Sequence, residues 1–251
     1  MKETNRVVIL AAGRGSRMIE LTKNSPKCLV KINKRPILYW LIEIIENSTV
    51  NNIQIICGYL ESMIKTKYKK TINKNWEKTN MVYSLFCSSE FNGSTIVSYS
   101  DIIYSSEYVN LLKDSQADFT ILADKKWHEL WSIRMDNPLN DAETFKSKDG
   151  YLTEIGGKAN EISEIEAQYM GLFKLSNNGY RIMRNIFDSL TEDKRKAIDM
   201  TSMFKILIKK KYKIKVIHVS GKWIEADSEL DVRIYNKQIL NGENWLHDWR
   251  D

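Results

Sequence analysis

The sequence feature that most constrains the fold is a short apolar segment that opens directly into a glycine-rich turn. Residues 6–11 form an apolar run typical of a buried parallel strand, and Gly13 and Gly15 follow it. Glycine tolerates positive φ, and successive main-chain N–H groups in such a turn form an anion-binding concavity. Arg17 and Lys27 add positive charge that suits a triphosphate. The turn therefore predicts either a phosphate-binding loop or a plain connection from a strand to a helix.

Strand-like and helix-like segments alternate along the first half of the chain. We expect strands at 53–57, 94–100 and 117–123, and helices at 36–47, 60–70 and 106–114. Such alternation implies right-handed crossovers and a mainly parallel sheet. Strand-like segments at 143–146, 151–155 and 168–174 then either extend this sheet in mixed orientation or form a small sheet above it. Helices at 179–190, 200–211 and 227–240 and a strand at 213–219 complete the pattern.

These segments predict an α/β fold: a single Rossmann-like, doubly wound domain over residues 1–251 with a mainly parallel mixed sheet. We expect an insertion at about 124–175 and a tail at 241–251.

The composition excludes several other classes of protein. No apolar run reaches the length of a membrane span, and the N-terminus lacks the pattern of a signal peptide, so we expect a cytoplasmic protein with no membrane partner. The three cysteines form no C-x-x-C pair and the three histidines lie far apart, which disfavours disulfides and zinc. The net charge is +6, but the lysine-rich run at 209–213 is typical of a helix end, so we expect no nucleic-acid partner. The oligomeric state stays open.

The full motif around the glycine turn points to one family. Residues 10–18 read L-A-A-G-R-G-S-R-M, with neither the third glycine of a dinucleotide loop nor the G-K-[ST] of a P-loop. With Pro26-Lys27 and the segment 36–38, this string resembles the signature of the sugar-phosphate nucleotidyltransferase superfamily. The resemblance implies a GT-A-like fold and an enzyme that uses a nucleoside triphosphate. It assigns the nucleotide to Leu10, Ala11, Ala12, Gly13, Arg14 and Gly15, and catalytic contacts with phosphate to Arg17 and Lys27.

Later segments narrow the branch of this superfamily. Residues 79–85, 98–104, 131–134, 137–144, 164–174 and 223–227 resemble, in this order, the small cytidylyltransferases that act on phosphocholine, 2-aminoethylphosphonate or L-glutamine phosphate. The resemblance is greatest to those that act on L-glutamine phosphate, which implies a role in capsule or cell-surface polysaccharide modification. The expected reaction transfers CMP from CTP to a small phosphorylated or phosphonate acceptor and releases pyrophosphate. Two alternatives stay open: a sugar-1-phosphate nucleotidylyltransferase that uses UTP or dTTP, and a non-catalytic nucleotide- or RNA-binding protein.

Two carboxylates are candidates for binding Mg²⁺. Asp101 follows a predicted strand, and the carboxyl end of such a strand borders the ligand crevice of an open α/β sheet. The family resemblance places a second acidic ligand in the segment 223–227, where we favour Asp227 and keep Glu225 as the alternate. One or two carboxylates suffice for magnesium, which keeps several waters. The competing structural interpretations are a turn cap for Asp101 and a helix N-cap for Asp227.

Asn80 and Ser84 are candidates for recognising the base. An asparagine amide offers both a donor and an acceptor to a pyrimidine edge, and Ser84 lies one helical turn further on. The alternative for Asn80 is a cap of the helix that follows.

The acceptor site is expected in the insertion at about 124–175. It draws on residues 124–143 and on two later positions, Lys158 and Glu166. Arg134 can pair with an acceptor carboxylate, Lys158 can hold the acceptor phosphate, and acidic residues can meet an ammonium group. Trp131 suits a cation–π contact, although two tryptophans four residues apart are also typical of a buried helix face. For Lys158 the alternative is an exposed residue after a turn. The acceptor candidates are Trp131, Arg134, Asp141, Glu143, Lys158 and Glu166.

Overall fold

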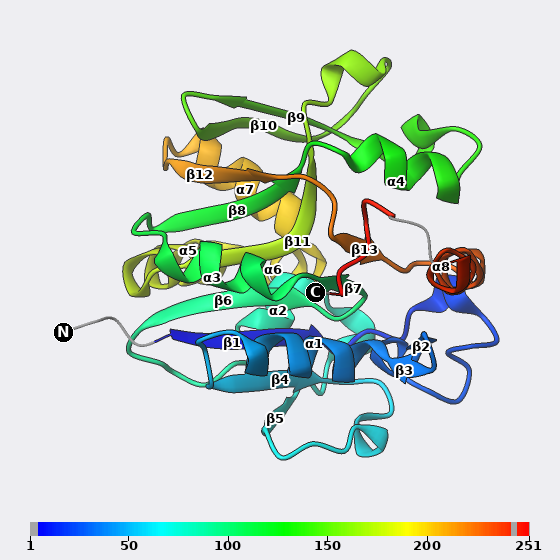
Figure 1. The fold of residues 1–251 in the computed structure, drawn as a ribbon. Coiled ribbons are helices and arrows are strands. Elements are labelled where there is room, and N and C mark those ends of the chain that lie inside the picture. Colours follow the sequence, from blue (N-terminus) through cyan, green and yellow to red (C-terminus); the bar gives the residue numbers. More distant parts are fainter. Residues whose placement is uncertain (1–4, 242–244, 251) are drawn as a thin grey trace.

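A nine-stranded mixed sheet forms the centre of the molecule. The structure is a computed structural model and describes residues 5–241 and 245–250. Within these residues, one sheet has the strand order β5-β4-β1-β6-β11-β8-β12-β10-β9 (Figure 1). Its strands are β1 (Asn5–Ala11), β4 (Ile53–Cys57), β5 (Lys69–Ile72), β6 (Ser94–Tyr99), β8 (Phe119–Asp124), β9 (Glu143–Lys148), β10 (Tyr151–Lys158), β11 (Gln168–Leu175) and β12 (Ile214–Val219). The predicted α/β fold with a mainly parallel mixed sheet is therefore confirmed.

The strand order reverses at β1. Strand β4 pairs in parallel with one edge of β1, and β6 pairs in parallel with the other. Ligands of open α/β sheets bind outside the carboxyl ends of the strands at such a switch point. The glycine turn follows β1 and Asp101 follows β6, so the topology brings both to this crevice.

The second half of the chain extends the same sheet. Strand β11 lies antiparallel between β6 and β8, β12 runs parallel to β8, and the β9–β10 hairpin forms the far edge. The sequence left open whether the strands after residue 124 extend this sheet or form a small sheet above it. They extend the sheet in mixed orientation. The tail predicted at 241–251 includes 242–244 and 251, which lie outside the described residues.

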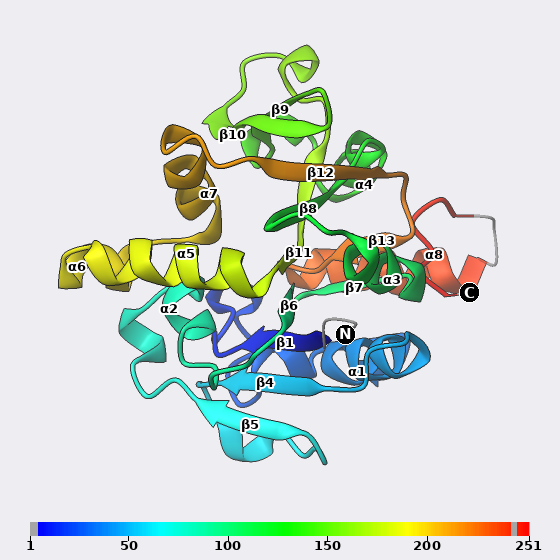
Figure 2. The same ribbon diagram turned by 90° about the vertical axis from the view of Figure 1, so that its left-hand side faces the viewer.

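Helices cover both faces of the sheet (Figure 2). Helices α1, α3 and α8 lie on one face, and α2, α5 and α7 lie on the other. Helix α4 follows β8, and α6 joins α5 to α7. The helix bounds are α1 (Ile37–Asn47), α2 (Met81–Leu85), α3 (Ser106–Asp114), α4 (Trp127–Arg134), α5 (Asn177–Ser189), α6 (Glu192–Ala197), α7 (Met200–Lys209) and α8 (Glu229–Asn241).

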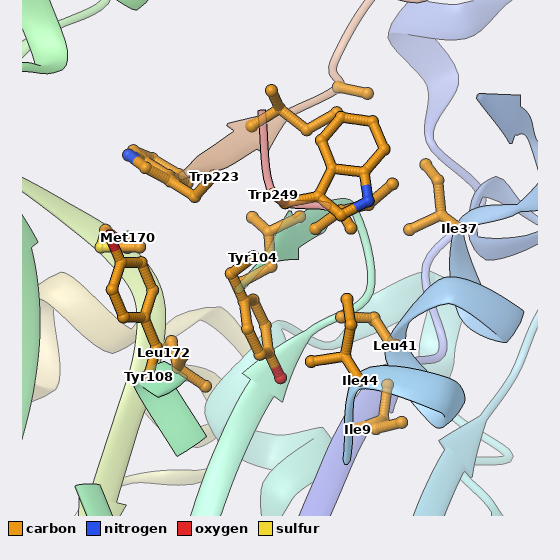
Figure 3. Close-up of a cluster of buried hydrophobic side chains, with 14 of the residues drawn as sticks. Ile9, Ile37, Leu41, Ile44, Tyr104, Tyr108, Met170, Leu172, Trp223 and Trp249 are labelled. Carbon is orange, nitrogen blue, oxygen red and sulfur yellow. The ribbon is translucent and has the colours of Figure 1, made fainter. Parts of the chain in front are cut away.

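Each face has its own hydrophobic core. On the first face, Ile37, Leu41 and Ile44 of α1 pack toward Ile9 of β1, and Trp249 of the tail closes the cluster (Figure 3). Burial of one such aliphatic side chain stabilises the fold by about 1.5–3 kcal/mol. The second face holds an equivalent core between β6, β8 and β11 and helices α5 and α7.

Two short strand pairs complete the part of the chain that the structure describes. Strand β2 (Lys31–Ile32) pairs with β3 (Arg35–Pro36), and β7 (Ile102–Tyr104) pairs antiparallel with β13 (Trp223–Glu225). None of the helices within 5–241 and 245–250 is both long and apolar enough to cross a bilayer.

The helix predicted at 60–70 is wrong. Leu60 takes a left-handed φ of 45°, a single 3-10 turn follows at Glu61–Met63, and the chain then enters β5. The apolar residues Leu60, Met63 and Ile64 mimic helical spacing over one turn only. Parallel pairing of β5 with β4 outweighs this weak local preference.

Candidate active site

The glycine turn is shaped around the side chain of Lys27. Gly15 has φ 76°, a left-handed conformation, and a Cβ atom built there would lie 2.8 Å from Cβ, Cγ and Cδ of Lys27. Met18 is buried and anchors the turn, and Thr22 Oγ1 donates to Gly15 O over 2.9 Å. The second glycine of the motif is therefore required both by its backbone conformation and by the lysine stem packed against it.

The ammonium group of Lys27 lies between two carboxylates. Its Nζ is 2.7 Å from Asp101 Oδ2 and 2.6 Å from Asp227 Oδ1. The lysine side chain is only 11% exposed. Burial alone would lower the pKa of Lys27, but the two carboxylates outweigh it and hold that pKa above its ordinary value. The residue stays charged at any physiological pH.

Pairing of β7 with β13 explains why the two aspartates meet. Asp101 immediately precedes β7, Asp227 closely follows β13, and these strands are antiparallel. The Ala226 N–H also donates to Asp101 O over 2.8 Å, which fixes the two segments side by side. Residues distant in sequence thus come to one point at the carboxyl end of β6.

A second layer of charged residues surrounds Asp227. Arg17 Nη2 lies 2.8 Å from Asp227 Oδ1, and Arg134 Nη2 lies 3.5 Å from Oδ2. Burial would raise the pKa of Asp227, but Lys27, Arg17 and Arg134 together lower it. Burial first, and the Asp227 carboxylate second, raise the pKa of the adjacent Glu225 to about 8. The pKa values of the two carboxyl groups therefore shift in opposite directions, and Asp227 is the charged member of the pair.

Arg134 is buried behind these carboxylates. None of its side chain is exposed, and it pairs with Asp231 (Nε to Oδ1, 3.1 Å) and Glu225 (Nη1 to Oε2, 3.5 Å) in addition to Asp227. Its guanidinium also stacks over Trp131, with Cζ 4.9 Å from the ring centroid. Asp231 Oδ2 in turn accepts the main-chain N–H of Asp227 at 2.8 Å. An acceptor carboxylate could reach Arg134 only if these pairs opened.

A cleft of about 170 Å³ opens beside Lys27. We call it the glycine-loop cleft; among its walls are Leu10, Ala12, Gly13, Lys27, Asn80, Ser84 and Asp101. The predicted nucleotide residues Ala11, Arg14 and Gly15 are not among its lining residues. Ala11 is buried, and Arg14 lies over the ring of Tyr59, with Cζ 5.6 Å from the centroid.

Asn80 and Ser84 both line the cleft but are already hydrogen-bonded. Asn80 Oδ1 accepts from Met81 N at the start of α2, and its Nδ2 donates to Ala197 O over 3.2 Å. The capping geometry that the sequence offered as an alternative is therefore present. Ser84 accepts from Asn73 Nδ2 over 3.0 Å. A role in base recognition stays a prediction for both.

A second cleft, of about 250 Å³, adjoins the first. Met81 and Tyr99 line both clefts, and Glu225 connects the second to the cluster around Asp227. We call it the acidic cleft, because four carboxylates line it: Asp141, Glu143, Asp199 and Glu225. Burial and the like charge of Asp199 raise the pKa of Glu143.

Three of the six predicted acceptor residues line the acidic cleft. Trp131, Asp141 and Glu143 do so, and Trp131 Nε1 donates to Asp141 Oδ2 over 3.0 Å. Lys158 is exposed at the end of β10, and Glu166 accepts hydrogen bonds from Ser147 N and Oγ, so both lie outside either cleft.

Sequence reasoning missed Asp199, Tyr99 and Tyr169, which also line the acidic cleft. The one signal at Asp199 is its position directly before a helix, where it caps α7 by accepting from Ser202 N over 2.6 Å. Tyr99 and Tyr169 read in the sequence as ordinary strand residues, and only the fold turns their rings into the cleft, 6.0 Å apart between centroids.

The two aspartates fit a hard divalent cation. Asp101 Oδ1 is buried and accepts no hydrogen bond from any described residue, so one oxygen in the crevice is unsatisfied. Carboxylate oxygens beside a space for phosphates are the ligands that such cations take. Across residues 5–241 and 245–250, no group of three or more His, Cys, Asp and Glu side chains is arranged as a metal site. Asp101 and Asp227 instead share the ammonium of Lys27.

A glycine turn and two cationic side chains beside a cleft, with two carboxylates close by, suit the transfer of a nucleotidyl group. The fold and this crevice together define the class of nucleotidyltransferases. Residues 7–132 match the family model described as the MobA-like NTP transferase domain. The chain belongs to this family, and the relatives found for it include cytidylyltransferases.

One relative spans nearly the whole chain. The CTP:phosphoglutamine cytidylyltransferase of Campylobacter jejuni is 38% identical over 90% of this chain and 98% of its own length. The choline-phosphate cytidylyltransferase of Streptococcus pneumoniae is 32% identical over 44% of this chain and 51% of its own length. Among solved structures, the CTP:phosphocholine cytidylyltransferase of S. pneumoniae superposes with a TM-score of 0.71 at 21% identity, covering 94% of this chain and 99% of that one. This last likeness bears on the fold.

Proposed function

We propose that this enzyme transfers CMP from CTP to a small acceptor that carries a phosphate or phosphonate and a positively charged nitrogen. L-glutamine phosphate is the favoured acceptor, with phosphocholine or 2-aminoethylphosphonate next. The near full-length similarity to a phosphoglutamine cytidylyltransferase supports this order.

The observation that carries the proposal is the opposite character of two adjoining clefts. The glycine-loop cleft contains part of the glycine turn together with Lys27 and Asp101, while four acidic side chains line the acidic cleft. A triphosphate suits the first and an ammonium group suits the second. L-glutamine phosphate, phosphocholine and 2-aminoethylphosphonate all carry a cationic nitrogen, whereas a sugar 1-phosphate carries none. The acidic cleft therefore favours a zwitterionic acceptor over a sugar phosphate.

The proposed reaction is an in-line displacement at the α-phosphorus of CTP. An oxygen of the acceptor phosphate or phosphonate forms the new bond to phosphorus, and the bond to the bridging oxygen of pyrophosphate breaks. The nucleophile is already an anion near neutral pH, so no general base is needed. Catalysis then rests on positioning and on neutralising the repulsion between two anions. Lys27 and Arg17 supply positive charge to the triphosphate, and the glycine turn supplies main-chain donors.

Asp101 and Asp227 are the residues that would hold Mg²⁺. The ion supplies charge neutralisation at the phosphate oxygens when it is bound. Arg134 and Asp231 keep the Asp227 segment in place through the hydrogen bond to its main-chain N–H.

The test is a matrix of CTP, UTP, dTTP and ATP against L-glutamine phosphate, phosphocholine, 2-aminoethylphosphonate and glucose 1-phosphate, read by magnesium-dependent pyrophosphate release. We expect CTP with L-glutamine phosphate to give the highest kcat/KM. Activity restricted to glucose 1-phosphate would contradict the proposed acceptor class. No release with any pair would contradict an enzymatic function.

A further inference from the structure

The position of Lys27 has a consequence for how a metal ion enters the site. Its ammonium group contacts one oxygen of each aspartate that is proposed to hold the ion. The lysine thus occupies the space between the two carboxylates and satisfies them without any added cation.

Asp227 is already heavily neutralised. Arg17 shares its Oδ1 with Lys27, and Arg134 faces its Oδ2. By contrast, Asp101 keeps one buried oxygen without a partner among the described residues. A divalent ion that approached both carboxylates while Lys27 stayed in place would meet strong repulsion from the adjacent ammonium.

The stem of Lys27 is held, but its end borders the cleft. Gly15 packs against Cβ, Cγ and Cδ, and the residue also lines the glycine-loop cleft together with Gly13. Rotation about the outer bonds of the side chain is enough to turn the ammonium from the carboxylates toward phosphates bound in that cleft. The missing side chain at Gly15 leaves the room for this arrangement.

We propose that Lys27 is an internal counter-ion which keeps the metal out of the free enzyme and yields the two aspartates only when a nucleotide offers its phosphates as the new partner. The inference rests on the proposed function, since it assumes that Asp101 and Asp227 hold the ion. It makes metal entry depend on nucleotide binding, so the free enzyme holds little metal by itself.

The test replaces Lys27 by methionine, which keeps the unbranched stem and removes the charge. Mn²⁺ binding to the free protein is measured by electron paramagnetic resonance, without nucleotide. We expect Lys27→Met to bind Mn²⁺ tighter than the wild type by on the order of tenfold or more, although its transferase activity falls. Lys27→Arg, which keeps a cation, is expected to bind Mn²⁺ as weakly as the wild type.

Two further variants locate the effect. In Lys27→Met/Asp101→Asn the gain in Mn²⁺ affinity is expected to disappear, and Lys70→Met, a lysine outside both clefts, is expected to change nothing. If Lys27→Met does not fold, Lys27→Gln removes the charge but keeps a polar side chain, and it carries the same expectation. An unchanged Mn²⁺ affinity in the folded neutral variant, or a gain that survives loss of Asp101, would overturn the proposal.

The two proposals fail in different ways. If the wild type transfers CMP but the neutral variant shows no gain in Mn²⁺ affinity, only the counter-ion role is refuted. If the neutral variant gains affinity but the wild type transfers no nucleotide to any acceptor, the proposed reaction is refuted while the cation exchange stands.

Discussion

The glycine-loop cleft and the acidic cleft share two wall residues but are built by different means. The first is lined by small residues of the glycine turn and by the larger Trp76, Met81 and Tyr99, with Lys27 and Asp101 as its charged groups. The second is lined by side chains, four of them acidic, and by no Lys or Arg among the residues described. A triphosphate is common to many enzymes and can be bound by backbone, whereas an acceptor is distinguished by individual side chains. Under the proposed function, substitutions that change the acceptor are expected on the acidic side.

Arg134 connects the two clefts and gives the largest expected effect. It faces Glu225 on the acidic side and Asp227 beside Lys27, and its side chain has no exposed surface. We expect Arg134→Met to lower the free energy of unfolding by about 3–5 kcal/mol, because it leaves buried carboxylates without their cation. Urea denaturation measures this loss.

The matched control is Arg233→Met, an exposed arginine of α8, which we expect to be neutral. If Arg134 instead bound an acceptor carboxylate, its replacement would raise the acceptor KM and leave the urea midpoint unchanged. That outcome would also contradict the contrast between the two clefts, because a cationic side chain would then take part in acceptor binding on the acidic side.

The contrast between the two clefts also explains why the sequence predicted the glycine-loop cleft better than the acidic cleft. The glycine-loop cleft comes from contiguous motifs, since Gly13, Gly15 and Lys27 must keep fixed spacing to form one turn with one packed lysine. Asp101 was predicted from its place after a strand, because the carboxyl ends of parallel strands border the crevice. These are local or topological rules that a sequence displays directly.

The acidic cleft depends on distances that no local pattern encodes. Asp199 appears in the sequence as a helix cap, and its approach to Glu143 depends on the packing of α7 against β10. Arg134 was predicted to face a substrate, but its burial follows from the partner Asp231 on α8, distant in sequence. Lys158 and Glu166 have suitable chemistry, yet Lys158 lies at the exposed end of β10 and Glu166 is hydrogen-bonded to Ser147 of β9, so neither lines a cleft.

Asp199 provides a direct test of the acidic side, with a smaller expected effect. Asparagine also caps helices, so Asp199→Asn keeps the bond to Ser202 N and removes only the charge. We expect the acceptor KM to rise roughly tenfold, which corresponds to about 1.4 kcal/mol, while the KM for CTP stays the same. Steady-state kinetics with each substrate varied in turn measure both values.

An exposed carboxylate serves as control: Asp149 lies in the turn between β9 and β10, and Asp149→Asn should alter neither KM. An equal rise in both KM values for Asp199→Asn would show that the acidic cleft does not discriminate between the two substrates.

The smallest expected effect concerns the contact between the tail and strand β13. His247 of the tail is buried, and its Nδ1–H donates to Trp223 O over 3.0 Å, at the start of the strand that leads to Glu225 and Asp227. Burial lowers the pKa of His247 below its ordinary value, although Asp124 opposes the shift. The unfolded chain therefore binds the proton more readily than the folded one, so the contribution of His247 to stability is complete at neutral pH and is lost as pH falls below about 6.5.

We expect the loss between pH 7.5 and pH 5 to be on the order of 1 kcal/mol greater in the wild type than in His247→Gln, measured by urea denaturation at both pH values. The half-exposed His128 on α4 supplies the control His128→Gln, which should retain the wild-type dependence on pH. Strand β13 leads to Glu225 of the acidic cleft and to Asp227 beside Lys27, so acid should weaken acceptor and CTP binding in parallel. Weakening of one alone would mean that the tail supports only that side of the site.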